Sequence, residues 1–213
     1  MSTETAFLSL ERGKLVRRAR HLAAGGLAWH AAEFAVAVVA GVAASSIALI
    51  AFGLDSLIEA AAGAVVLWRF TDGRESSELA ERRAQRMIAI SFLVLAAYVV
   101  VQALRTLVSG RHSEPSLIGI GLAIFTVPVM QAMARAKRGV GRHLSSAAAV
   151  SEGAQNLLCA YLAVALLAGL GLNAVFGWWW ADPIAALVIA GVALREGFVV
   201  WREHICCEAA RTP

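Results

Sequence analysis

The chain has 213 residues, of which 59% are apolar and only 16% are charged. About a quarter of the residues in a soluble domain are normally charged, so this composition excludes an ordinary soluble protein and indicates a membrane protein. A net charge of +4 would also suit nucleic-acid binding. Basic loops beside a lipid bilayer explain the same charge, and we expect no nucleic-acid partner.

Apolar blocks long enough to cross a bilayer, which takes about 20 helical residues, recur along the chain. They predict an all-α polytopic membrane protein with six transmembrane helices, at residues 25–44, 47–68, 87–108, 115–134, 147–171 and 178–200. A tight turn near Ser45 and Ser46 separates the first two spans, because the combined block would be about 60 Å long as one helix. The predicted domains are a cytoplasmic N-terminal arm at 1–24, the membrane domain at 25–200 and a short cytoplasmic tail at 201–213.

Basic residues predict the orientation, because Lys and Arg beside the spans are retained on the cytoplasmic side. All of them except Arg105 and Arg111 fall in the N-terminal arm, in the loops after the second and fourth spans, or near the C-terminal end. Both termini are therefore predicted to be cytoplasmic. The expected location is a membrane crossed several times, which in a bacterium would be the plasma (inner) membrane.

Two acidic residues interrupt the second span, within FGLDSLIEAAAG at 52–63. Asp55 and Glu59 are four positions apart and share one helix face. An ionised carboxylate at the middle of a span costs about 2.5 to 3.5 kcal/mol, and two neighbouring carboxylates also repel each other. Because no Lys or Arg is expected deep in a span, we expect a bound cation or protons as the counter-charge. The structural alternative is a protonated pair that only serves helix packing.

A weak repeat of this segment occurs one hundred residues later. SSIALIAFGLDSLIEA (45–60) and SSAAAVSEGAQNLLCA (145–160) share serines, a glycine, a leucine and two alanines when aligned without gaps. The alignment places the two acids opposite Gln155 and Cys159, and Glu152 lies on the same helix face. The second and fifth spans should run in opposite directions, as in an inverted repeat. If these faces meet, they combine carboxylates, an amide oxygen and a thiol, which is a ligand set for a divalent cation.

The segment SSIALIAFGLDSLIE resembles the second-helix signature of the cation diffusion facilitators, approximately S-x-A-L-x-A-D-A-x-H-x-x-x-D. Six spans with cytoplasmic termini, and the Asp-Pro step at Asp182 and Pro183, are similar to that family as well. The resemblance covers residues 25–200 and implies efflux of a divalent metal. Most members carry a cytoplasmic metal-binding domain after the sixth span. The short tail therefore predicts a divergent branch without that domain, and membrane residues such as Gly119 and Gly121 would hold a possible homodimer.

The resemblance also implies a metal site, here formed by Asp55, Glu59, Gln155 and Cys159, with Glu152 beside them. This site departs from the family pattern, because an aspartate replaces the second-helix histidine and the fifth helix carries glutamine and cysteine. A thiolate favours Zn²⁺, whereas carboxylates with an amide suit Mn²⁺, Fe²⁺ or Co²⁺. We expect Zn²⁺ first, as a transported ion and not as a cofactor.

Two further polar groups are weaker candidates. His30 and Glu33 in the first span could form an ion entrance or a proton relay, since ionisable groups inside a membrane usually have a function. For Glu33 a solvated helix end is an equal alternative, and for His30 a place at the membrane interface is favoured. In the tail, His204, Cys206 and Cys207 could hold a soft metal, although their spacing does not match a closed zinc site.

The predicted function is divalent metal efflux in exchange for protons, through a site between the second and fifth spans at mid-membrane. A metal-binding membrane protein that senses or regulates without transport is the alternative, and a membrane metalloenzyme is a third hypothesis. No Gly-rich phosphate loop, catalytic triad or H-E-x-x-H pattern occurs in the sequence, so we do not expect an enzyme.

Overall fold

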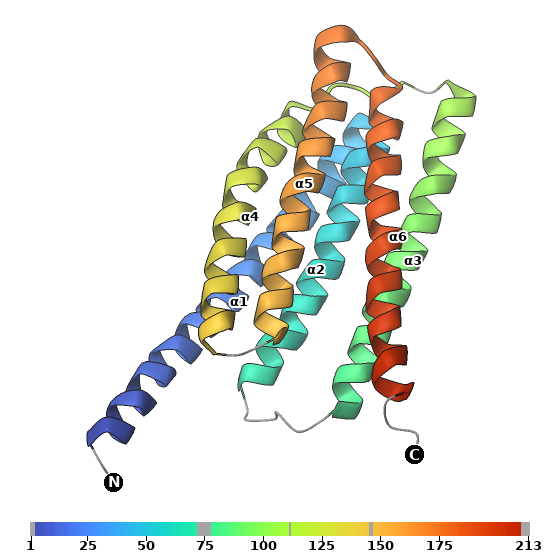
Figure 1. Ribbon diagram of the computed structural model, residues 1–213. Helices are drawn as coiled ribbons and strands as arrows, with labels where there is room; N and C mark the ends of the chain where they lie inside the picture. Colours follow the sequence, from blue (N-terminus) through green and yellow to red (C-terminus); the bar gives the residue numbers. More distant parts are fainter. Residues whose placement is uncertain (1–2, 72–77, 111, 145–146, 210–213) are drawn as a thin grey trace.

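The computed structural model describes residues 3–71, 78–110, 112–144 and 147–209, and these form six helices and no strand. The helices are α1 (Thr3–Ala44), α2 (Ile47–Thr71), α3 (Glu78–Ser109), α4 (Leu117–His143), α5 (Ala147–Phe176) and α6 (Ala181–Ala209). Over the described residues, five of them contain a stretch that is long and apolar enough to cross a membrane. The remaining helix, α6, lies beside α3 and α5 at the same height of the bundle (Figure 1). The expectation of an all-α, polytopic membrane protein is confirmed.

Most helices are longer than the spans predicted from the sequence. α1 begins at Thr3, so the expected N-terminal arm is largely helical and continuous with the first span. α4 continues to His143 where an end at residue 134 was expected. Both chain ends lie at the same end of the bundle, as an even number of crossings requires (Figure 1).

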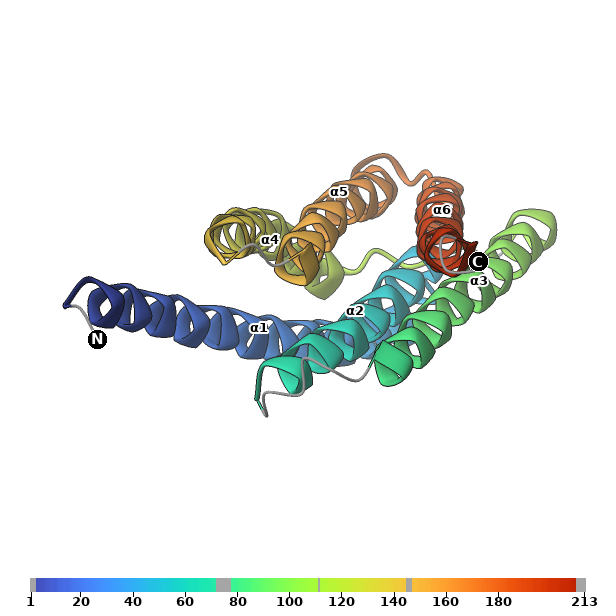
Figure 2. The same ribbon diagram turned by 60° about the horizontal axis from the view of Figure 1, so that its bottom comes forward.

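The helices form two layers of three. Viewed from one end, α1, α2 and α3 lie in one layer and α4, α5 and α6 in the other (Figure 2). Within the bundle, α1 packs most extensively with α2, α4 with α5, and α3 with α6. Corresponding helices of the two halves also meet, since α1 packs on α4 and α2 on α5. α1 and α4 run in opposite directions (Figure 1), so the second half repeats the first with its direction inverted.

Two glycines that the repeat aligns make the same kind of contact in the two halves. A Cβ atom on Gly53 would lie 2.9 Å from the Val38 side chain of α1, and one on Gly153 would lie 3.0 Å from the Ala134 carbonyl oxygen of α4. Glycine therefore lets α2 approach α1, and α5 approach α4, more closely than any larger residue would. Gly119, considered above for a dimer contact, also packs against other helices of the same chain.

A buried aspartate connects the start of α6 to the start of α2. α1 ends at a turn in which Ser45 has a left-handed backbone, with φ 52, and Ser46 precedes α2, as predicted. The fully buried Asp182 carboxylate accepts hydrogen bonds from the Ser46 hydroxyl and, at 3.0 Å, from the Ile47 backbone N–H. The first N–H groups of a helix have no partner within it, and a negative charge there also interacts favourably with the helix dipole. Asp182 therefore fixes α6 against the turn between α1 and α2.

We predict that Asp182→Ala lowers the apparent melting temperature in detergent by about 5–10 °C, because each buried donor left without a partner costs about 1–3 kcal/mol. Asp182→Asn keeps one acceptor oxygen, so its melting temperature should fall less than that of Asp182→Ala. Thermal unfolding of both variants beside the wild type is the measurement. A loss for Asp182→Asn as large as for Asp182→Ala would contradict the role of the accepted hydrogen bonds.

Candidate metal site

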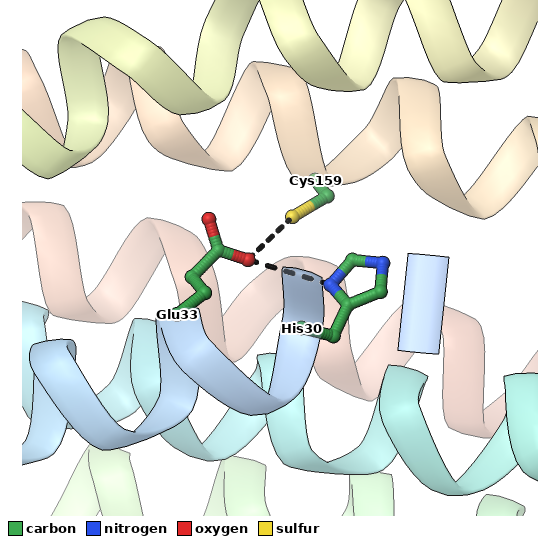
Figure 3. Close-up of side chains that lie close together, drawn as sticks. All are labelled: His30, Glu33 and Cys159. Atoms are coloured by element: carbon green, nitrogen blue, oxygen red, sulfur yellow. Dashed lines mark hydrogen bonds and ion pairs between the residues drawn. The ribbon is translucent and has the colours of Figure 1, made fainter. Parts of the chain in front are cut away.

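Three helices bring a histidine, two carboxylates and a thiol together inside the bundle. α1 contributes His30 and Glu33, α2 contributes Glu59, and α5 contributes Cys159. All four side chains are buried, and Glu59, the most exposed of them, is only 8% exposed. Figure 3 shows the side chains of His30, Glu33 and Cys159 pointing toward one another from α1 and α5. We call these four residues the central cluster.

The donor atoms of His30, Glu33 and Cys159 all lie within 4.8 Å of one another, and Glu59 adjoins this group through His30. His30 Nδ1 lies 3.4 Å from Glu33 Oε2 and 3.3 Å from Glu59 Oε2. Cys159 Sγ lies 3.8 Å from Glu33 Oε2. A tetrahedral zinc site with bonds of about 2.0–2.3 Å has distances of about 3.3–3.7 Å between its ligand atoms. The three contacts lie close to this range, so His30, Glu33 and Cys159 could hold such an ion, and Glu59 would have to move toward them to become the fourth ligand.

Two atoms of the central cluster are buried without a hydrogen-bond partner, as far as the described residues go. They are His30 Nδ1 and Glu59 Oε2, which face each other but are not aligned for a hydrogen bond. A buried polar atom without a partner costs about 1–3 kcal/mol, and native structures contain few of them. A cation bound between the two atoms would remove this cost.

Hydrogen bonds from three other residues hold Glu33 at the centre of the bundle. Thr126 of α4 donates to Glu33 Oε1, and Trp29 of α1 donates to the same atom at 3.4 Å. Ser56 of α2 donates to Glu33 Oε2 at 2.9 Å. Together with the Cys159 thiol, these donors connect Glu33 to helices from both halves of the chain. The Thr126 and Ser56 hydroxyls could not be singled out from the sequence, because such residues are common in apolar helices.

The site residues predicted from the sequence are only partly brought together. Glu59 and Cys159 belong to the central cluster, and Asp55 is buried one helical turn before Glu59, close enough to Glu33 for their charges to interact. Among the described residues, the tightest group of donor atoms comes from His30, Glu33 and Cys159, so neither Asp55 nor Glu59 belongs to it. Gln155 is only half-buried, and its neighbour on α5, Asn156, faces the bundle interior.

A solvated helix end, considered for both His30 and Glu33, is wrong for both residues. The two side chains are 4% and 1% exposed. Both were placed near a helix end because the first span was expected to begin at residue 25. α1 begins many residues earlier, so these side chains lie well inside the bundle, where α2, α4 and α5 cover them.

The expectation that Lys137 lies in a loop after the fourth span is also wrong, because α4 continues to His143. Lys137 is 3% exposed, and its ammonium group donates to Glu152 Oε1 at 2.6 Å. Glu152 therefore forms an ion pair with Lys137 and lies outside the central cluster. Buried residues mark one face of α4 at steps of four, four and three positions. They are Thr126, Met130, Ala134 and Lys137. The sequence predicts that the span ends at residue 134, because charged residues follow it. The spacing of the buried residues nevertheless continues through these charged residues to Lys137.

The tail candidates cannot be placed in the same way. α6 extends to Ala209, but the side chains of His204, Cys206 and Cys207 lie outside the described residues. A metal site there stays a prediction from the sequence.

Comparison with known proteins identifies one family. The model of the cation efflux transmembrane domain matches residues 27–205. The protein described as "Putative transporter MamV" of Paramagnetospirillum magneticum is 32% identical to this chain over 113 residues. That match covers 53% of this chain and 34% of the relative, so it spans about a third of the relative's length.

We predict that the purified protein binds Co²⁺, used as a spectroscopic substitute for Zn²⁺, with the absorption band of a cobalt–thiolate bond. Cys159→Ser should abolish the band, because Cys159 is the thiol of the central cluster. The double variant Cys206→Ser and Cys207→Ser is the control and should keep it. Absorption titration is the measurement, and a band that survives Cys159→Ser but disappears in the control would move the site to the tail.

Proposed function

Because this chain belongs to the cation efflux family, we propose that it carries a divalent metal ion out of the cytoplasm through the central cluster. The observation that supports this most is the meeting of three donor residues, His30, Glu33 and Cys159, inside a membrane bundle, with Glu59 beside them and two donor atoms lacking hydrogen-bond partners. Family membership also favours a transporter over an enzyme. A homodimer, suggested by the family resemblance, stays a prediction.

The donor set favours Zn²⁺ as the transported ion. One imidazole, two carboxylates and one thiolate form a four-coordinate set of the kind that zinc accepts. An octahedral ion with bonds of about 2.1 Å needs six ligands, with distances of about 3.0 Å between neighbouring ones. The spacings of 3.3–3.8 Å within the cluster are longer and suit a tetrahedron better. Mn²⁺, Fe²⁺ and Co²⁺ remain the competing cargoes, because carboxylates bind them too.

The inverted repeat provides a mechanism for alternating access. His30, Glu33 and Glu59 come from the first half of the chain, and Cys159 comes from the second half. Rocking of one half against the other would move the thiol relative to the other three ligands. The same movement that opens the site to one side would therefore also weaken its hold on the ion.

Protons are the counter-ions that can replace the metal. When the ion leaves, Glu33, Glu59 and the nearby Asp55 remain as buried acids, which are costly in a membrane while they carry charge. Arriving metal has to displace protons from its ligands, so binding and proton release are linked. A higher proton concentration outside the cell should help to expel the ion there.

We predict that Glu33→Gln and Glu59→Gln each lower the initial rate of Zn²⁺ uptake into inverted vesicles by more than about ten-fold. Removing even a residue that only supports a metal ligand costs about 10–100-fold in affinity, and a ligand should cost at least as much. Glu114→Gln, at an exposed acid in the loop between α3 and α4, is the matched control and should transport normally. Equal transport by all three variants would contradict the site. Binding without uptake by the wild type would favour the sensor alternative.

We further predict that an acidic vesicle lumen speeds Zn²⁺ uptake. The lumen of an inverted vesicle corresponds to the outside of the cell, and protons leaving it would be exchanged for entering metal. A proton ionophore that collapses the gradient should return the rate to its value without a gradient. An equal uptake rate with and without the pH gradient would contradict proton exchange, but it would not contradict Zn²⁺ transport.

A further inference from the structure

A series of polar contacts leads from the Lys137–Glu152 ion pair to the central cluster. The Lys137 ammonium donates to the side-chain oxygen of Asn156 at 3.0 Å. The amide nitrogen of Asn156 lies 3.5 Å from His30 Nε2 and donates to the Met130 sulfur at 3.1 Å. Lys137 and Asn156 are both buried, at 3% and 2% exposure. Neither residue belongs to the central cluster.

The lysine determines which way the asparagine amide points. An ammonium group can only donate hydrogen bonds, so the Asn156 oxygen has to face Lys137. The Asn156 NH₂ group, which is also only a donor, therefore faces His30 Nε2. That nitrogen has to accept, so in a neutral imidazole the hydrogen lies on the other nitrogen, Nδ1. Nδ1 is the atom that faces Glu33 and Glu59 in the central cluster.

This arrangement holds His30 in the tautomer that cannot bind a metal through Nδ1. Coordination requires a lone pair on Nδ1, with the hydrogen on Nε2 and an acceptor facing it. Asn156 can offer its oxygen only by turning its amide, which breaks the hydrogen bond to Lys137. We propose that Lys137 and Asn156 are positioning residues that decide whether His30 is available to the metal. The proposal rests on the proposed function, since it assumes that the cluster binds the transported ion.

The position of the Lys137–Glu152 ion pair links the availability of His30 to opening of the bundle. A Cβ atom on Gly26 of α1 would lie 2.7 Å from Lys137 Nζ, and one on Gly63 of α2 would lie 3.5 Å from Glu152 Oε1. The pair therefore also lies against α1 and α2. Lys137 is six residues before the end of α4 at His143, and Glu152 is five residues after the start of α5 at Ala147. These two helix ends lie at the end of the bundle that carries both termini (Figure 1). Lys137, Glu152 and Asn156 all belong to the second half of the chain and His30 belongs to the first, so separation of the two halves at that end would part Asn156 from His30. The path to the cluster would then open as His30 Nε2 is released from the Asn156 NH₂ group.

The test is Co²⁺ and Zn²⁺ titration of the purified full-length protein. Asn156→Asp offers an acceptor oxygen to both Lys137 and His30, and we expect it to bind both metals about ten-fold more tightly than the wild type. Gln131→Glu is the matched control, because it adds the same charge at a half-buried position of α4 next to Met130. It should change the affinity much less. Gly26→Ala adds no charge, but its methyl group takes the space of the Lys137 ammonium group. Asn156 would then be free to turn its oxygen toward His30, so this variant should also bind both metals more tightly.

A second readout detects the tautomer directly in the metal-free protein. ¹⁵N NMR of histidine-labelled wild type should show His30 with the hydrogen on Nδ1, and Asn156→Asp should move it to Nε2. A His30→Gln spectrum identifies the signal among the five histidines. An asparagine that served only to stabilise the fold would not change this signal.

The two results together separate the possible failures. Tighter binding by Asn156→Asp and Gly26→Ala, with a reversed tautomer in Asn156→Asp, supports the proposal. If the wild type binds Co²⁺ through Cys159 but neither variant binds more tightly than Gln131→Glu, the positioning role is overturned and the metal site remains. A wild type that shows no cobalt–thiolate band would instead overturn the proposed site itself.

Discussion

Buried carboxyl groups are the constraint on which the rest of this structure depends. An ionised acid inside an apolar bundle needs a counter-charge or several hydrogen-bond donors. The chain meets this need in two ways. Glu152 has a permanent counter-charge in Lys137, at 2.6 Å. In the described ion pairs, Glu33 and Glu59 have only the His30 imidazole as partner. The first arrangement is suited to hold helices together, and the second is suited to accept an ion that comes and goes.

The inverted repeat explains why the residues of the central cluster meet where they do. The two halves pack face to face, and the cluster lies on their interface, where Cys159 of α5 contacts Glu33 of α1. Gly53 and Gly153 allow the close helix pairs that form each half. Asp182 fixes α6 against the start of α2, at the end of the bundle away from the termini. With that end fixed, the other end of the bundle, where Gly26 of α1 lies against Lys137 of α4, is the natural place for the two halves to separate.

Part of the site could be predicted because burial of charge leaves a clear signal in a sequence. Glu59 and Cys159 were found from polar residues in an apolar context and from the repeat. Gln155 was selected by the same repeat, but an alignment fixes a residue's place along a helix more securely than the direction of its side chain. A rotation of one residue separates Gln155 from Asn156, and packing against α1 and α4 decides which of them faces inward.

The sequence alone determined that the chain is a bundle of membrane helices, that the turn lies at Ser45 and Ser46, and that acids are buried in it. These features depend on local composition and on periodicity, which need no knowledge of neighbours. Only the tertiary structure decided that His30 and Glu33 join Glu59 and Cys159, and that Lys137 is buried beside Glu152. Such facts depend on helix length and rotation, which are set by contacts between residues as far apart in the chain as His30 and Asn156.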